Sequence, residues 1–303
     1  MDTIDFFRVY GPHEDQKAYT KLKKAAAPAG CKAWIRTLKG TKNHICWFKI
    51  QCHEQLGYST PTKQDIANLR SIVDGWLACA DLSLDDFTLA RIDYDYNFYM
   101  SPDEADLLLN TMQQLSTKTA RMEKWNGTSD PTVYYQCKSR HMQLYRKDKE
   151  RKDKKKPVKA EEECMCRQEV QCHSGRIKYM RRKYGLVRDW DNWVTPEMEA
   201  YYLTAAESVF PSGDFYSLDR AAAIIQASSY SDCKKKRLQE MLAIIQKDTV
   251  AALKDFACPN TIKKYFAMLK ELNVNPLTIK VNPEDNPSGI TYIKNPFFKS
   301  KGI

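Results

Sequence analysis

The sequence lacks the features that would place it in a membrane or outside the cell. No run of about 18 apolar residues occurs in its 303 residues, which argues against a transmembrane helix. The opening stretch, MDTIDFFRVYGPHEDQ, has no basic segment followed by an apolar one, so we expect no secretory signal. The ten cysteines are scattered along a long chain rather than set in a disulfide framework. We therefore expect reduced thiols and a cytoplasmic protein.

Several motifs of common enzyme classes are also missing. There is no P-loop, no Gly-x-Ser-x-Gly, no His-Glu-x-x-His and no His-x-His. Their absence makes ATP hydrolysis and serine-hydrolase chemistry poor first choices. A zinc site is the weaker alternative for Cys164, Cys166, Cys172 and His173. Zinc cysteines usually sit two to four residues apart on a turn, whereas a strand would point Cys164 and Cys166 the same way.

Positive charge is what the sequence has in excess. It contains 48 Lys and Arg against 38 Asp and Glu, a net charge of +10, which favours a polyanionic partner such as nucleic acid. One basic run, RKDKERKDKKKPVK (146–159), could simply be a solvated, mobile connector. A second, GRIKYMRRKYGLVR (175–188), interleaves cations with apolar side chains. It predicts a packed basic helix at 176–185 that contacts DNA through Lys178, Arg181, Arg182 and Lys183.

The spacing of apolar residues predicts an α+β fold, with a mostly antiparallel sheet and helices packed against it. Hydrophobic residues make up 43% of the chain, enough for a packed core. Strand patterns occupy residues 4–10, 32–40, 44–54, 88–98, 132–149 and 163–173. Helix patterns occupy residues 62–80, 100–116, 196–210, 217–229, 231–257 and 258–276.

These elements predict a catalytic α+β domain over residues 1–190, with a Lys-rich connector at 146–160. A smaller helical domain is expected over 195–285, where it could bind DNA or a partner protein, followed by a tail over 286–303. The most clearly marked helix start is at Ser101. It can cap the helix, Pro102 suits the first helical position, and acidic residues follow in the first turn.

The stretch TLARIDYDYNFYM (88–100) alternates two kinds of side chain. Ile92, Tyr94 and their even-numbered successors are apolar, whereas Arg91, Asp93, Asp95 and Asn97 are polar. Such alternation is typical of a half-buried strand. Solvated strand faces usually mix Thr, Lys, Ser and Glu. Two aspartates beside an arginine therefore call for a more specific explanation.

Two further strands show polar stripes of the same kind. If all three stripes meet on one sheet face, they gather carboxylates, cations, a histidine and a tyrosine: Arg91, Asp93, Asp95, Arg167, Glu169, Gln171, His141, Gln143, Tyr145 and Lys147. Carboxylates on rigid strands suit Mg²⁺ or Mn²⁺, which prefer oxygen ligands. The alternative is a structural ladder of Arg–Asp ion pairs, which would stabilise the sheet by only a few tenths of a kcal/mol each.

Three segments occur in an order that resembles a known family: RIDYDYNF with its capped helix, SRHMQLYRKDKE, and CRQEVQCHSGRIKYMRRKYGL. The set is similar to the replication initiators of filamentous phages, the gene II product type, and to their plasmid and phage relatives. The resemblance covers about residues 88–190. It implies an endonuclease that nicks one DNA strand at an origin, joins a tyrosine to the 5′ phosphate and starts rolling-circle replication.

Carried over to this sequence, the resemblance implies roles for individual residues. Tyr145 falls at the nucleophile position with Lys147 beside it, and His141 could carry a proton. Asp93 and Glu169 fall at positions suited to a Mg²⁺ or Mn²⁺ ion, and Asp95 joins them by alternation alone. Arg91 and Arg167 would hold DNA phosphate. Tyr184 and Tyr179 are the alternative nucleophiles. The partners expected are origin DNA and, beyond it, a host helicase or polymerase.

A non-catalytic nucleic-acid-binding regulator is the competing hypothesis. Its strand aromatics could stack on single-stranded bases, and its basic segments could hold phosphates. Tyr94, Tyr96 and Phe98, however, lie opposite the aspartates, where a core role is simpler. Carboxylates facing a phosphate would repel it unless a metal ion lay between them. This argument favours chemistry over simple binding.

Overall fold

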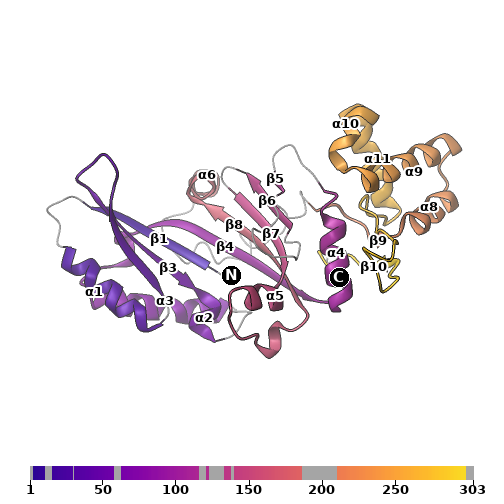
Figure 1. Cartoon of the computed structure of the whole chain (residues 1–303). Helices are drawn as coiled ribbons and strands as arrows, with labels where there is room; N and C mark the ends of the chain where they lie inside the picture. The colour runs from indigo at the N-terminus through magenta and orange to yellow at the C-terminus, as the bar shows by residue number, and fades with distance from the viewer. Residues whose placement is uncertain are drawn as a thin grey trace. The chain divides into compact units, whose positions relative to one another are not determined.

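The computed structural model of the chain describes residues 3–10, 16–29, 31–57, 63–115, 121–122, 133–137, 140–185 and 210–297 (Figure 1). Its main sheet has eight strands, in the order β2 (Lys32–Thr37), β3 (His44–Gln51), β1 (Thr3–Tyr10), β4 (Thr88–Tyr99), β8 (Met165–His173), β7 (Arg140–Arg146), β6 (Val133–Cys137) and β5 (Arg121–Met122). The pairs β1–β3, β1–β4, β2–β3 and β5–β6 are antiparallel. The chain combines helices with this sheet of antiparallel pairs, which confirms the predicted α+β class.

The chain divides into two compact units. The first unit comprises residues 1–96, 138–141 and 169–202, and the second unit comprises residues 97–137, 142–168 and 203–303. Strands β4, β7 and β8 contribute residues to both. The domain boundary predicted near residues 190–195 lies outside the described residues, as does the helix predicted at 196–210.

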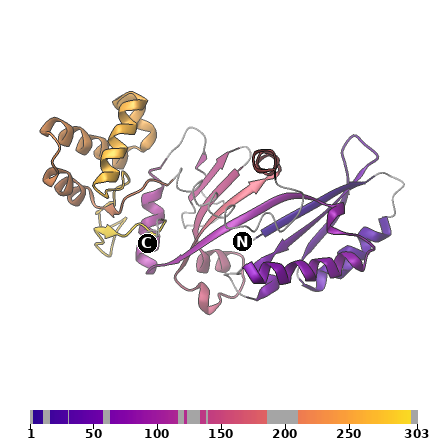
Figure 2. The same cartoon turned by 180° about the vertical axis from the view of Figure 1, so that it is seen from behind.

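The first unit has its core on one face of β1 and β3. Helices α1 (Gln16–Ala26), α2 (Cys52–Leu56) and α3 (Lys63–Ala78) accompany these strands (Figure 2). The rings of Phe6 and Phe48 stack with centroids 5.0 Å apart, and Tyr10 stacks on Tyr19 of α1 at 4.1 Å. Aromatic burial of this kind accounts for much of the stability of a small sheet-and-helix layer.

A bulge breaks the pairing of β1 with β4. Asp5 lies opposite Arg91, but the next residue, Phe6, lies opposite Leu89, so Ala90 is the extra residue. Because of the bulge, Leu89 and Arg91 point to opposite faces of the sheet although both numbers are odd. Leu89 is buried in the core, whereas Arg91 is only half-buried.

The second unit contains the helix start that was clearest in the sequence. Helix α4 (Pro102–Met112) begins after Ser101, whose side chain accepts a hydrogen bond from the Glu104 amide. The Glu104 carboxylate in turn accepts one from the Ser101 amide, completing a capping box. The prediction of this helix is confirmed, including Pro102 at its first position.

The Lys-rich run is folded, which differs from the connector expected. The pattern read as one strand over 132–149 forms β6 and β7, and Lys147 begins helix α5 (Lys147–Asp153) instead of continuing the strand. A 3-10 turn (Ala160–Glu162) follows. Acidic partners fix the run: Arg146 bonds Asp106 and Asp148, and Arg151 bonds Glu162. Two of these partners, Asp106 and Glu162, lie on other elements, so composition alone could not reveal them.

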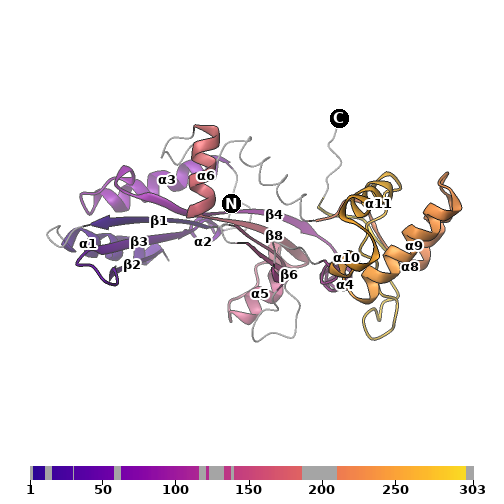
Figure 3. The ribbon, with the colours of Figure 1, turned by 90° about the horizontal axis from the view of Figure 1, so that it is seen from above.

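The described part of the helical segment in the second unit starts at residue 210. It contains β9 (Phe215–Tyr216), α8 (Leu218–Ala227), α9 (Asp232–Lys247), α10 (Leu253–Phe256), α11 (Pro259–Glu271) and β10 (Tyr292–Ile293) (Figure 3). The buried side of α9, with Leu238, Met241, Leu242 and Ile245, packs with α8. The helices predicted at 217–229, 231–257 and 258–276 are confirmed, the second as α9, a 3-10 turn (Val250–Ala252) and α10. Part of the predicted tail is also ordered, because β10 pairs with β9.

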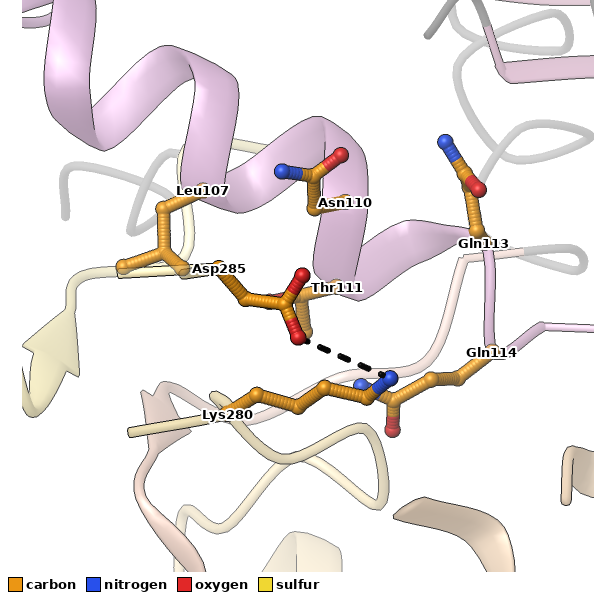
Figure 4. A pocket seen from close by; sticks show the side chains of 7 residues that line it. All are labelled: Leu107, Asn110, Thr111, Gln113, Gln114, Lys280 and Asp285. Atoms are coloured by element: carbon orange, nitrogen blue, oxygen red, sulfur yellow. Dashed lines mark ion pairs between the residues drawn. The ribbon is translucent and has the colours of Figure 1, made fainter. Parts of the chain in front are cut away.

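Helix α4 is joined to this helical segment through Gln114. Its side-chain amide donates to the Thr278 carbonyl at 2.7 Å, and its own carbonyl accepts from the Val250 amide at 3.0 Å. A small polar pocket of about 100 Å³ lies beside it, where Lys280 pairs with Asp285 at 4.0 Å (Figure 4). Its size and polarity suit ordered water rather than a large ligand.

We predict that Arg151→Met costs about 3–5 kcal/mol in the free energy of unfolding. Arg151 and Glu162 are both buried, with Nη2 and Oε1 2.7 Å apart, so removing the guanidinium strands a buried carboxylate. Urea denaturation followed by circular dichroism measures the change. Lys152→Met is the matched control, since Lys152 is exposed, and it should cost less than about 1 kcal/mol. Equal losses in the two variants would contradict the prediction.

Candidate functional site

A partly buried ion pair forms the centre of the candidate site in the first unit. Arg91 of β4 donates two hydrogen bonds to Asp93 of the same strand, from Nε at 2.7 Å and from Nη2 at 2.5 Å. Asp93 is 0% exposed. Arg91 also approaches Glu169 of β8, with 3.9 Å between Nη2 and Oε1. The structural alternative considered from the sequence, an Arg–Asp pairing, is therefore present, but mainly within one strand.

Glu169 continues the network toward two histidines. The side-chain amide of Gln171 donates to Glu169 Oε1 at 2.7 Å, and Gln171 also hydrogen-bonds His141 of β7. His141 Nδ1 and His173 Nε2 lie 3.2 Å apart and share a hydrogen bond. We call this set the polar network: Arg91, Asp93, Glu169, Gln171, His141 and His173. It joins three strands by contacts between side chains rather than by sequence proximity.

The two histidines are held in the neutral form. Burial lowers the pKa of His141, and the positive charge of Arg91 lowers it further, although the bond with Gln171 opposes this. Burial, with His141 and Arg91, lowers the pKa of His173 to about 4. For Arg91, burial alone would lower the pKa, but the hydrogen bonds with Asp93 and nearby carboxylates raise it. Arg91 is thus a permanent cation. A neutral imidazole can accept a proton or bind a metal through its unprotonated nitrogen.

The predicted metal ligands Asp93, Asp95 and Glu169 are not assembled as a cation site. The part of the chain that the structure describes holds no group of three or more His, Cys, Asp or Glu side chains arranged to bind a metal. Both oxygens of Asp93 accept from Arg91, and Glu169 accepts from Gln171. Asp95 follows on β4, half-buried. In this arrangement Arg91 occupies the position at Asp93 that a cation would need.

Tyr145 and Lys147 belong to the second unit. Tyr145 is the penultimate residue of β7 and is 8% exposed, and Lys147 Nζ lies 5.8 Å from the centre of its ring. The two side chains lie near each other, but Lys147 reaches the ring from the first turn of α5 and not from the strand face predicted for it. Lys147 also pairs with Glu150 at 3.1 Å.

Helix α6 (Ser174–Tyr184) confirms the predicted basic helix. Tyr179 is 46% exposed, with the Arg176 guanidinium 4.8 Å and Lys183 Nζ 6.0 Å from its ring centre. Among the predicted DNA contacts, Lys178, Arg182 and Lys183 are exposed and Arg181 is half-buried. Tyr184 is the last residue of the helix, and its side chain lies outside the described part. Of the two candidate nucleophiles whose side chains are described, Tyr179 is more exposed than Tyr145.

Arg167 differs from its predicted role. It is 0% exposed and donates a hydrogen bond from Nε to Asn97 Oδ1 at 2.8 Å. A side chain enclosed in this way presents no surface to DNA, so its part in this arrangement is structural. Alternation correctly placed Arg167 on a strand face but could not show that the face is covered.

Three residues of the site were not singled out for it by sequence reasoning. His173 was considered only as a zinc ligand, Gln171 only as a member of a stripe, and Asp5 not at all. Asp5 lies opposite Arg91 on β1, and burial raises its pKa, although Lys49 and Arg91 pull it down. A signal for Asp5 was present: it is an acidic residue within the apolar strand pattern IDFFRVY. Its partner strand could not be read from one sequence.

Comparison with known protein families gave a match in this region. Residues 66–196 match the family model that describes the N-terminal part of the phage replication-associated protein encoded by gene II. The match spans β4, β7, β8 and α6, so it includes the whole polar network and all three candidate tyrosines. It confirms the resemblance to the filamentous-phage gene II type and supports a role as a rolling-circle replication initiator. No curated protein matches the sequence.

Among the described residues, no helix combines the length and the apolar character needed to cross a bilayer.

We predict that His173 makes the fold less stable in acid. In the unfolded chain it takes up a proton as pH falls through 6.5, but in the folded chain only near pH 4. Between these values the unfolded state binds more protons, so the free energy of unfolding decreases as pH falls. Urea denaturation at several pH values should show this slope in the wild type and a flatter profile in His173→Gln.

The control for this experiment is His44→Gln on β3, a histidine that hydrogen-bonds Gln16 on the helix-covered side of the sheet. This variant should keep the acid slope of the wild type. An unchanged profile in His173→Gln would show that other groups cause the acid sensitivity.

Proposed function

We propose that this chain is an endonuclease that nicks one DNA strand at a replication origin and remains joined to the 5′ end. The free 3′ hydroxyl would then prime rolling-circle replication. The observation that carries the proposal is the family match over residues 66–196, which covers the polar network and the exposed basic helix α6. Both features lie in the first unit.

The proposed reaction is a transesterification. A tyrosine oxygen attacks the scissile phosphorus, a bond from phosphorus to that oxygen forms, and the bond to the 3′ oxygen breaks. The phenol loses its proton to a base, and the departing 3′ oxygen takes up a proton. One phosphodiester is exchanged for another, so the reverse step can rejoin the strand without ATP. This agrees with the absence of a P-loop in the sequence.

The resemblance assigns the nucleophile to Tyr145, and accessibility favours Tyr179 as its rival. The cation of Lys147 near the Tyr145 ring would help the phenol to ionise. Tyr179 has Arg176 and Lys183 beside its ring and is open to solvent. Tyr145, Tyr179 and Tyr184 are thus the three candidate nucleophiles, and substituting each in turn distinguishes them.

A requirement for Mg²⁺ or Mn²⁺ is part of the proposal and rests on the resemblance. Such an ion would withdraw electrons from the scissile phosphate. Asp93, Asp95 and Glu169 are the carboxylates that the resemblance names for it. Arg91 neutralises Asp93 in the described arrangement, so the residues as they lie do not fit an ion, and we assign no reaction step to one.

The second candidate function is a nucleic-acid-binding regulator without catalysis. The exposed cations of α6 favour it, because they can hold phosphates without any chemistry. Under this alternative, the polar network would serve only to fix β4, β7 and β8 together. Either function could involve a host helicase or polymerase as a partner.

We predict that the purified protein converts supercoiled plasmid carrying its own origin to open circles when Mg²⁺ or Mn²⁺ is present. The 5′ end should carry protein, as shown by a mobility shift that proteinase removes. Tyr145→Phe should reduce nicking by orders of magnitude, because it deletes the attacking oxygen and little else. Tyr99→Phe, at an exposed tyrosine, is the matched control and should nick normally.

The other variants decide between the alternatives. Full nicking by Tyr145→Phe, with loss in Tyr179→Phe or Tyr184→Phe, would transfer the nucleophile to α6. If the wild type shifts the mobility of the DNA but never nicks it, with or without chelator, the binding-protein alternative is correct. Asp93→Asn tests the ion separately, with its thermal melting recorded because Asp93 is buried.

A further inference from the structure

One face of the sheet in the first unit is not part of the core. In the pairing of β1 with β3, Asp5 lies opposite Lys49 and Val9 lies opposite Ile45, and Trp47 belongs to the same face. Ile4 and Phe6 alternate with these residues and point into the core with α1 and α3. Val9 is among the exposed large apolar side chains. We call the face that carries Asp5, Trp47 and Val9 the open face.

The open face contains a cavity of about 440 Å³, within the range of about 300–1,000 Å³ that small-molecule pockets occupy. It lies where the bulge at Ala90 interrupts the pairing of β1 with β4. Its lining combines apolar and charged groups: Asp5, Ile45, Trp47, Ala90, Arg91, His173 and Ser174. The residues come from β1, β3, β4, β8 and the start of α6, so the pocket lies next to the polar network.

Asp5 is the unusual member of this lining. It is 8% exposed, and its Oδ1 atom is buried without a hydrogen-bond partner among the described residues. A buried carboxylate oxygen without a donor is costly, and the cost is recovered when a ligand brings an N–H group. Lys49 and Arg91 supply positive charge nearby, but neither donates to Oδ1.

Aromatic rings and cations on β2 and β3 lie on the same face as the pocket. The indoles of Trp34 and Trp47 are parallel, with centroids 6.0 Å apart. Lys32 and Arg36 flank Trp34 on β2 and are exposed. Aromatic surfaces beside cations are the usual means of holding single-stranded nucleic acid, since bases stack on the rings and phosphates pair with the cations.

We propose that this cavity binds one unpaired base of single-stranded DNA, with Trp47 against the ring and Asp5 accepting hydrogen bonds from its N–H edge. Arg91 and the exposed cations of β2 would face the adjoining phosphates. The proposal rests on the proposed function, since it concerns the DNA strand on which that function acts. A lone phosphate would be repelled by Asp5, and one carboxylate beside Arg91 is a poor cation site.

The chemistry of Asp5 selects among the bases. Guanine presents two adjacent donors, the ring N1–H and the exocyclic amine, which match one carboxylate. Thymine presents a single N–H between two carbonyl oxygens, and these would face the carboxylate unfavourably. The pocket should therefore prefer guanine to thymine, by roughly tenfold in affinity if the pair is bidentate.

The test compares two short single strands in the presence of chelator, so that nicking does not occur. One is oligothymidine and the other is the same strand with a central guanine, each carrying a fluorophore for anisotropy. The wild type should bind the guanine strand roughly tenfold more tightly. Asp5→Asn should reduce that ratio to near one, because an amide cannot accept both hydrogen bonds. Asp81→Asn, at an exposed aspartate, should keep it.

A second measurement covers the case in which Asp5→Asn does not fold. In wild-type protein, dGMP should shift the indole NMR signal that Trp47→Phe removes, and dTMP should shift it less. Equal affinity of the wild type for both strands, or no shift of that signal, would overturn the proposal. Nicking without guanine preference would reject this inference alone, whereas guanine preference without nicking would reject only the proposed function.

Discussion

The candidate site is organised by the bond between Arg91 and Asp93 inside β4. A carboxylate that is fully buried must be neutralised, and the guanidinium does this with two hydrogen bonds at 2.7 and 2.5 Å. Once fixed, Arg91 is the positive charge to which its other neighbours respond: it approaches Glu169, lowers the pKa of His141 and His173, and lines the open-face cavity. The positive charge of Arg91 thus acts on β4, on the two histidines and on the cavity at once.

The same principle explains why the Lys-rich run is folded in the second unit. Clustered lysines repel one another and ordinarily stay solvated, but here acidic groups from other elements compensate the charge. Asp106 of α4 accepts from both Arg146 and Lys149, and Glu162 accepts from Arg151. In the second unit, charges that look unexplained in the sequence are thus explained by acidic partners outside the Lys-rich run.

This pattern sets what could be predicted from the sequence. The N-cap at Ser101 and the alternation of β4 from Arg91 onward depend on neighbours within a few residues, and both were predicted correctly. The encounter of His141 with His173 depends on strand order, and the burial of Arg167 depends on what covers its face. The three carboxylates were predicted to share a site because their strands alternate in phase. Alternation gives no information about which charge lies between them, and that charge is Arg91.

The bulge at Ala90 changes which residues of β4 face the core. Up to Leu89 the odd-numbered residues of this strand point into the core, and from Arg91 onward they point away from it. Deleting Ala90 would remove the bulge and restore regular pairing with β1, and Arg91 would still lie opposite Asp5. Deleting a residue from the regularly paired part of the strand would instead turn the side chains on one side of the deletion to the opposite face. The single extra residue at Ala90 thus lets the odd-numbered side chains change faces while the pairing on either side of it is kept.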